Sequence, residues 1–337
     1  MKELLKELCL INGVSGDEKA VREVIINKIK DVCNDYKIDN LGNLICFKKG
    51  RKSGKKLMIC AHMDEVGFIV KYINSDGTLS FGAVGGIDPS VVIGRQVKVG
   101  KINGIIGSTA VHNLSKEQRE KAPFMDSLYI DIGAENKADA EKYVKLGDCA
   151  YFESEFAELG EKRIKSKAID DRAGCAMMIK LMHEELEYDT YFVFNVQEEI
   201  GLRGSTVSAF SVNPDFAVVL ESTTASDIDG VSGARKVCQL GKGAVVGFMD
   251  RSTVYDKGLY NLAFDISKEN NIPCQTKTMV AGGNDSGAIH ISRGGVRTIA
   301  VSVPCRYLHS PSSVIEMNDL ESCYKLVKLM AERIPEL

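Results

Sequence analysis

The sequence predicts an α/β protein in which helices flank a mixed, mostly parallel sheet and a small β-barrel-like domain is inserted into the chain. Short apolar runs rich in branched and aromatic residues alternate with segments of helical periodicity, which is typical of a sheet covered on both faces. A glycine-rich stretch with alternating apolar residues interrupts this order. The 337 residues are enough for one large domain and one smaller domain.

The first fifty residues predict two helices and a hairpin. Residues 1–11 and 20–32 carry apolar side chains at helical spacing. Ser15 and Glu18 match a capping box, with Ser15 as the N-cap of the second helix. Residues 36–48 read as two short strands joined by a turn at Asn40-Leu41-Gly42-Asn43.

Four apolar runs predict the buried strands of the sheet, and three longer periodic segments predict helices. Because the strands alternate with helices, the sheet is expected to be mostly parallel. The strands are expected at residues 56–60, 191–196, 216–220 and 298–303, and the helices at 172–186, 256–270 and 318–334.

The inserted domain is expected between the first strand of the sheet and the rest. Eight glycines fall between residues 77 and 107, among short alternating apolar segments, a pattern typical of a small antiparallel β domain with many turns. We therefore assign residues 67–158 to the insert, and residues 1–66 and 159–337 to the main domain.

Composition narrows the possible functions and locations. A net charge of −3 gives no basic footprint for nucleic acid, and no apolar run is long enough to span a bilayer. The ten cysteines form no Cys-x-x-Cys pair, which argues against a zinc ribbon or a thioredoxin-like site. The first residues do not match a signal peptide, so we expect a cytoplasmic protein with reduced thiols.

Ligand-type residues follow each of the four predicted strands directly. The carboxyl ends of strands in an open α/β sheet meet at one crevice, so these side chains are expected to converge. A carboxylate before the helix at residue 172 fits the same place, because the positive end of the helix favours it. The residues are His62 and Asp64, Glu198 and Glu199, Glu221, His309, and Asp170 before the helix.

Two imidazoles and several carboxylates without a thiolate suit zinc, cobalt or manganese. Two metal ions about 3.5–4 Å apart need a bridging carboxylate and further ligands on each ion. Glu198 is then not needed as a ligand and can act as the general base for a metal-activated water. The residues thus predict a metal-dependent hydrolase with two divalent ions, held by His62, Asp170, Glu199, Glu221 and His309.

Five stretches of the sequence resemble the dinuclear-metal aminopeptidases of the tetrahedral (TET) type, a family also known as glutamyl aminopeptidases and in some cases as endoglucanases. The resemblance runs over essentially the whole chain, and it implies a zinc-exopeptidase-like fold for the main domain. The stretches are AHMDEVGF at 61–68, AIDDRAGC at 168–175, VQEEIGLRGS at 196–205, GGNDSGAIHISRGGVRT at 282–298 and VPCRYLHSPSSV at 303–314.

The resemblance implies a role for each site residue. Asp170 bridges both metal ions, Asp64 orients His62, and Glu198 is the general base and acid. It also implies a cis peptide bond between Asp170 and Asp171. Many relatives carry aspartate where Glu221 stands, and the longer glutamate side chain changes how the carboxylate can bind the ion. The first ion is held by His62 and Glu221, and the second by Glu199 and His309.

The resemblance further implies that the insert mediates dimer contacts and that dimers assemble into a hollow dodecamer admitting short peptides. We expect an aminopeptidase that removes N-terminal residues with two divalent ions per subunit, zinc or cobalt before manganese. The alternatives are an endoglucanase-like glycoside hydrolase, which needs two carboxylates and no metal pair, and a non-catalytic peptide-binding oligomer.

The sequence leaves three properties undecided: the native metal, the choice between dimer and dodecamer, and the preferred N-terminal residue of the substrate. Arg235, Lys236 and Lys242 either favour acidic residues or are solvated loop charges. His112 is either a loop histidine or a contributor to a neighbouring subunit's site. His183 is expected at the surface and His290 packed in a helix over residues 286–292.

Overall fold

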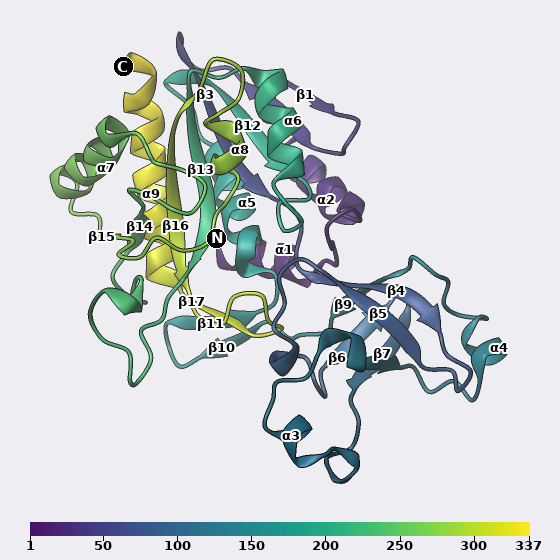
Figure 1. Ribbon diagram of the computed structural model, residues 1–337. Coiled ribbons are helices and arrows are strands. Elements are labelled where there is room, and N and C mark those ends of the chain that lie inside the picture. Colours follow the sequence, from purple (N-terminus) through teal and green to yellow (C-terminus); the bar gives the residue numbers. More distant parts are fainter.

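The computed structural model describes residues 1–337 and has the predicted α/β architecture, so the fold class is confirmed (Figure 1). An eight-stranded mixed sheet forms its centre, and four of the seven neighbouring strand pairs are parallel. In spatial order its strands are β1 (Asp35–Ile38), β2 (Leu44–Lys48), β12 (Tyr188–Asn195), β3 (Lys52–His62), β13 (Phe216–Thr224), β16 (Arg297–Cys305), β14 (Ala244–Val246) and β15 (Cys274–Thr276).

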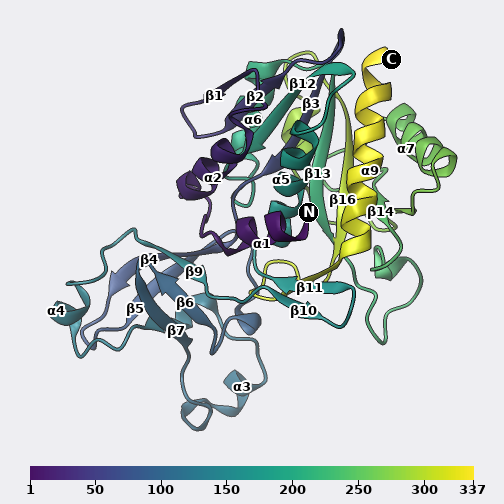
Figure 2. The ribbon, with the colours of Figure 1, turned by 180° about the vertical axis from the view of Figure 1, so that it is seen from behind.

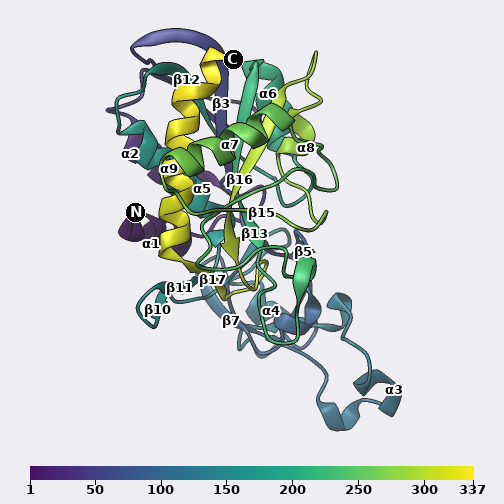
Figure 3. The same cartoon turned by 90° about the vertical axis from the view of Figure 1, so that its left-hand side faces the viewer.

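Helices cover both faces of this sheet. The edge-on view places one group on one side and a second, smaller group on the other (Figure 3). The first group is α1 (Lys2–Leu10), α2 (Lys19–Ile29), α5 (Ile169–Met182) and α9 (Met317–Arg333), seen from the front in Figure 2. The second is α6 (Arg203–Val212) and α8 (Ser286–Ile289), while α7 (Lys257–Glu269) packs on α9 near the β15 edge.

The central strands are apolar because both of their faces are covered. Residues 57–61 of β3 and 216–220 of β13 are buried throughout. Together with the helices they form one core of 60 buried apolar residues. Burying this apolar area is the main driving force for folding, and it fixes the sheet as the rigid base of the molecule.

The glycine-rich stretch folds into a closed barrel below the sheet (Figure 1). Its 16 buried apolar residues form a core separate from that of the sheet, and Phe68 packs edge-on against Phe81 and Phe152 with ring centroids 4.9 and 5.2 Å away. The barrel strands are β4 (Gly67–Ile73), β5 (Leu79–Val84), β8 (Tyr129–Asp131), β7 (Ile102–Gly107), β6 (Gln96–Val99) and β9 (Cys149–Phe152), with short helices α3 (Lys116–Arg119) and α4 (Lys137–Ala140) in the connections. The exact domain boundaries at 67 and 158 stay predictions.

A small three-stranded sheet lies between the large sheet and the barrel. It consists of β10 (Ala157–Leu159), β11 (Arg163–Ser166) and β17 (Ser313–Glu316). β11 leads directly into α5, and β17 follows the segment after β16, so this sheet fixes both segments near the ends of the central strands.

The predicted capping box at Ser15 is wrong. Helix α2 begins at Lys19, with Glu18 at the N-cap position. The Ser15 hydroxyl donates instead to Asp64, 49 residues away, at an Oγ–Oδ2 distance of 2.6 Å. A buried carboxylate is a stronger hydrogen-bond partner than a backbone N–H group of the turn, so the Ser15 hydroxyl bonds to Asp64.

No helix of the molecule combines the length and the apolar character that a membrane span needs.

Candidate metal centre

The structure brings the predicted ligand residues together from four strands and one helix. His62 is the last residue of β3, and its neighbour across the parallel pair is Asn195, the last residue of β12. Glu198 and Glu199 follow β12. Glu221 was expected beyond a strand end but lies inside β13, which continues to Thr224. Its side chain still reaches the site, because its Oε1 lies 3.4 Å from His62 Nε2.

The ligand atoms form two clusters that share one carboxylate. His62 Nε2 lies 3.5 Å from Asp170 Oδ1 and 3.4 Å from Glu221 Oε1. His309 Nε2 lies 3.6 Å from Asp170 Oδ2 and 3.4 Å from Glu199 Oε2. The Asp170 carboxylate therefore lies between the two histidines, with one oxygen facing each of them.

The other ring nitrogen of each histidine is hydrogen-bonded to a backbone carbonyl. His62 Nδ1 lies 3.0 Å from the carbonyl oxygen of Asp64, and His309 Nδ1 lies 2.8 Å from that of Gly86. A carbonyl only accepts, so the proton sits on Nδ1 in both rings. Each Nε2 then points at the carboxylates, which is the arrangement of a metal-binding histidine.

Asp64 holds the two halves of the site together. Its carboxylate accepts from Ser15 Oγ at 2.6 Å and from the backbone N–H groups of Glu198 and Glu199 at 3.0 and 3.1 Å. Burial favours the protonated form of Asp64, but the hydrogen bonds to it and the charge of His62 outweigh burial and lower its pKa. Asp64 therefore fixes the turn that carries both glutamates.

Several oxygens in the clusters are buried without a hydrogen-bond partner: Asp170 Oδ1, Asp171 Oδ2 and Glu221 Oε2. Burial raises the pKa of Asp171 and Glu221 well above the usual range, with the charge of Asp170 acting in the same direction. Ligand atoms of His62, Asp171 and Glu221 lie within 4.8 Å of one another, and so do those of His62, Asp170 and Glu199. Buried carboxylate oxygens without a hydrogen-bond donor are suited to binding a cation.

Glu198 and Glu199 line a cavity of about 830 Å³ together with Asp170, Glu221 and His309. Burial raises the pKa of Glu198 well above its ordinary value; His62 opposes the rise and Asp285 adds to it. Burial also raises the pKa of Glu199 to about 7 against the opposing charge of His309. The cavity is large enough for an amino-terminal residue and its neighbour.

The remaining histidines lie outside the clusters. His112 is exposed in a 3-10 turn of the barrel connection before α3. His183 Nε2 lies 2.9 Å from the carbonyl of Lys28. His290 Nδ1 lies 2.8 Å from the carbonyl of Ser286, just past the end of α8, which stops at Ile289 rather than 292.

Sequence reasoning missed four contributors to the site. Ser15 was assigned to a helix cap, and Asp171 was treated only as the neighbour of the bridging residue. Gly86 contributes a backbone carbonyl, for which no side-chain signal exists. Asp285 lies in the stretch 282–298 that carries the resemblance, but no role was predicted for it; its Oδ2 accepts from Asn195 Nδ2 at 2.8 Å, while its other oxygen is buried and unpartnered.

The sequence pattern of the M42 glutamyl aminopeptidases matches residues 42–326 of the chain. The chain belongs to this family. The expected resemblance is therefore confirmed, and the chain is an aminopeptidase, a hydrolase of peptide bonds. The implied cis bond between Asp170 and Asp171 is present as well.

Two relatives and one solved structure illustrate this membership. A putative aminopeptidase of Acetivibrio thermocellus is 41% identical over 97% of both chains. A lysyl aminopeptidase of Pyrococcus furiosus is 33% identical over 98% of this chain and 97% of the relative. The TET1 peptidase of Pyrococcus horikoshii, which can assemble into a tetrahedron or a large octahedral shell, is 36% identical and covers 98% of this chain and 99% of its own, with a TM-score of 0.87.

Proposed function

We propose that this M42 aminopeptidase works with two divalent metal ions held by the two clusters. The position of Asp170 carries the proposal, because its two oxygens lie 3.5 Å and 3.6 Å from the Nε2 atoms of His62 and His309. His62 and Glu221 would hold one ion, Glu199 and His309 the other, and Asp170 both.

The donor set supports zinc or cobalt, with manganese as a further possibility. Two imidazole nitrogens, several carboxylates and no thiolate suit these ions, and metal availability decides among them. The unpartnered buried oxygens of Asp170 and Glu221 fit ligands that a cation would satisfy. Asp171, whose Oδ2 is also unpartnered, offers a further carboxylate oxygen within 4.8 Å of ligand atoms of His62 and Glu221.

The proposed mechanism assigns the proton transfers to Glu198. The bound ions would supply Lewis-acid polarisation of the scissile carbonyl and would lower the pKa of water toward 7. Glu198 takes the proton from the attacking water and later delivers it to the departing amine. Asp64 keeps Glu198 in place through the N–H bond at 3.0 Å and orients His62 through its own carbonyl.

Metal removal tests the proposal. We expect the protein to hydrolyse a panel of aminoacyl-p-nitroanilides, to lose this activity on dialysis against a chelator, and to regain it with zinc, cobalt or manganese. Elemental analysis is expected to find two ions per subunit in the active form. The N-acetylated anilides serve as the control, since an aminopeptidase needs a free amine. Full activity in metal-free protein would refute the metal-dependent mechanism.

Two alternatives have distinct outcomes in the same assays. A glycoside hydrolase needs two carboxylates about 5–10 Å apart that flank the sugar bond, and the two histidines between the carboxylates have no role in that chemistry. Chelator-resistant cleavage of a glucan would favour it. A non-catalytic peptide-binding oligomer would leave the Glu198→Gln protein as active in cells as the wild type.

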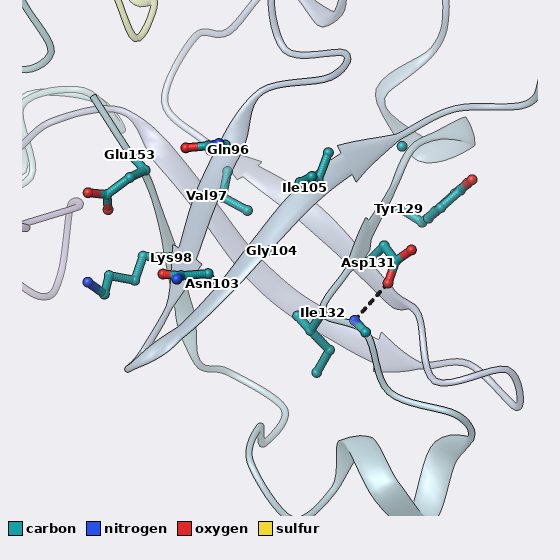
Figure 4. A pocket seen from close by; sticks show the side chains of 12 residues that line it. Gln96, Val97, Lys98, Asn103, Gly104, Ile105, Tyr129, Asp131, Ile132 and Glu153 are labelled. Carbon is teal, nitrogen blue, oxygen red and sulfur yellow. Dashed lines mark hydrogen bonds between the residues drawn. The ribbon is translucent and has the colours of Figure 1, made fainter. Parts of the chain in front are cut away.

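We further propose that the chain assembles into a homo-oligomer through the barrel. A hollow of about 770 Å³ lies on the outside of β6, β7 and β8, beside the exposed Ile105. Figure 4 shows Lys98 and Glu153 toward one end of this hollow and Tyr129 toward the other. An open, partly apolar surface of this kind suits a protein contact, and the TET1 peptidase of P. horikoshii is itself an assembly. Light scattering after gel filtration distinguishes monomer, dimer and dodecamer.

The ten free cysteines support a place in the reducing cytoplasm, as expected from the sequence.

A further inference from the structure

The cavity lined by the metal clusters also carries three cationic side chains: Arg235, Arg251 and Lys277. None of them forms an ion pair, and the two arginines make no side-chain hydrogen bond within the protein. Lys277 Nζ donates only to the carbonyl oxygen of Ala281, at 2.8 Å. Arg306, in contrast, is paired with Asp227 at 2.6 Å. The three cations are therefore available to a ligand.

The carboxylates of Asp250 and Glu221 influence Lys277 electrostatically, but neither forms an ion pair with it, and Asp250 is committed to other donors. It accepts from the Tyr255 hydroxyl at 2.6 Å and from the backbone N–H groups of Ser252 and Thr253 at 2.8 and 2.7 Å. Lys277 is half-buried, and burial lowers its pKa although the charges of Asp250 and Glu221 oppose this, so the lost hydration of the ammonium is only partly compensated. A negative charge brought in by a ligand would offset this loss.

Backbone hydrogen bonds connect the three segments that carry these cations. Arg251 N–H donates to the carbonyl of Gly282 at 2.9 Å, next to the segment of Lys277. Thr278 donates from its N–H to the carbonyl of Val237 at 2.9 Å and from its hydroxyl to that of Ala234 at 2.8 Å. The cations thus lie on a preformed wall and not on independent loops.

We propose that Lys277, with Arg251 and Arg235 nearer the solvent, binds a carboxylate of the substrate and so selects peptides with a negative charge close to the scissile bond. This inference rests on the proposed function of the same cavity. The family description names glutamyl substrates and one relative is a lysyl aminopeptidase, so membership leaves the charge preference of this chain undecided. The carboxylate belongs either to an acidic first side chain or to the carboxyl terminus of a short peptide.

Two substrate pairs separate these sources. Glutamyl- and glutaminyl-p-nitroanilide differ only in the side-chain charge and have no terminal carboxylate. Leu-Gly-Gly and its C-terminal amide differ only in the terminal charge. We expect wild-type kcat/KM to favour the charged member of one pair, and Lys277→Met to reduce that ratio about tenfold or more, since a hydrogen bond to a charged group contributes about 1.5–3 kcal/mol.

Lys277→Arg is expected to keep most of the preference, and Lys242→Met is the matched control, because Lys242 is an exposed cation outside the cavity. Calorimetric binding of the same pairs to the Glu198→Gln protein gives the ratio without turnover. A wild-type protein that binds these pairs selectively but cleaves nothing would contradict the proposed function alone. Equal ratios in wild type and Lys277→Met, in both rates and binding, would overturn the cationic wall as a carboxylate site.

Discussion

At the scale of single residues, the carboxylate of Asp64 determines how the site is arranged. It accepts hydrogen bonds from the hydroxyl of Ser15 in the N-terminal segment and from two backbone N–H groups in the turn after β12. None of these contacts involves a proposed metal-binding atom. The geometry of the two clusters therefore depends on Asp64, a carboxylate that is not among the proposed metal ligands, as is common in metalloenzymes.

Ser15→Ala is expected to weaken metal binding about 10- to 100-fold, the usual cost of removing a supporting hydrogen bond around a metal ligand. Competition with a chromogenic chelator measures the affinity. Ser53→Ala is the matched control, because the Ser53 hydroxyl donates to Asp189 at the same distance of 2.6 Å on the surface. Unchanged affinity in Ser15→Ala would mean that the backbone N–H groups alone hold Asp64.

The adjacent residues Glu198 and Glu199 are expected to respond differently to the same substitution. Glu198→Gln should lower kcat about 10²- to 10⁴-fold, as for loss of a general base, while the metal content stays at its wild-type value. Glu199→Gln should lower the metal content. Steady-state kinetics together with elemental analysis check both. A Glu198→Gln protein that has lost an ion would make Glu198 a ligand and not the base.

At the scale of elements, the turn after β12 depends on a close approach at Gly204, the second residue of α6. A Cβ at this position would lie 2.2 Å from the carbonyl oxygen of Val196 and 2.4 Å from Asn43 Oδ1. Neither atom can move easily, because Asn43 Oδ1 accepts from the N–H of Val196 at 2.9 Å and Asn43 Nδ2 donates to the carbonyl of Gly204 at 3.0 Å.

Gly204→Ala is therefore expected to destabilise the protein by about 1–3 kcal/mol, the usual cost of overpacking, and to reduce activity because Val196 leads into Glu198. Gly294→Ala is the control: no atom lies within 4 Å of its Cβ position, so its effect should stay within about 0.5 kcal/mol. Urea denaturation measures both. Similar stability of the two variants would show that the α6 junction can relax.

The N-terminus of α9 carries a pH-dependent contact. Asp319 accepts from the N–H groups of Gly241 and Gly243, both at 2.7 Å, and burial raises its pKa to about 6 despite these bonds. Because the folded pKa exceeds the unfolded value of about 3.9, the contribution of Asp319 is complete below about pH 4 and is lost as the pH rises through about 6.

The difference in unfolding free energy between wild type and Asp319→Asn is therefore expected to shrink from pH 4 to pH 7. Urea denaturation at each pH measures it. A difference that is constant or grows with pH would contradict the raised pKa of Asp319.

The sequence predicted most elements but not the contacts between them. The apolar runs and helical periods placed the central strands and helices to within a few residues, because both faces of the sheet are buried and leave a continuous apolar signal. The same logic brought His62, Asp170 and His309 together. Ser15 was misassigned because a capping box is recognised from neighbouring residues alone. Its actual partner, Asp64, is distant in the sequence and comes close only when the chain folds.

The cationic wall shows the same limit. Arg235 and Lys242 were equivalent in the sequence, yet only Arg235 lines the cavity. Lys277 was not singled out, because its lack of an ion-pair partner depends on three loops that meet only after folding. Which charges remain unpaired is a property of the tertiary structure.

At the scale of the whole molecule, a buried ionic cluster joins the N-terminal segment, the entrance to the barrel and the start of α5. Lys167 Nζ donates to both Glu65 oxygens at 2.6 and 2.8 Å. Glu65 also accepts from the N–H of Gly13 at 3.1 Å. The side chains of Lys167 and Glu65 are each only 3% exposed, so neither charge has access to solvent as an alternative.

Lys167→Met is expected to cost about 3–5 kcal/mol, because it removes the nearest cation from the buried Glu65 carboxylate and leaves only Arg172, whose Nη2 lies 3.7 Å from Glu65 Oε1. Lys167→Met combined with Glu65→Leu should recover part of this loss. A double-mutant cycle by urea denaturation measures the coupling. Additive effects of the two substitutions would mean that the two charges are held independently.

The bond from His309 to the Gly86 carbonyl crosses between the two bodies of the molecule. Gly86 follows the barrel strand β5, whereas His309 follows β16 of the large sheet. Exchanging barrels between homologues would therefore also exchange the carbonyl that sets the ring orientation of a proposed metal-binding histidine. The loop that carries Gly86 therefore has to keep its backbone path relative to His309, a constraint that the candidate metal centre places on this part of the insert but not on the rest of the barrel.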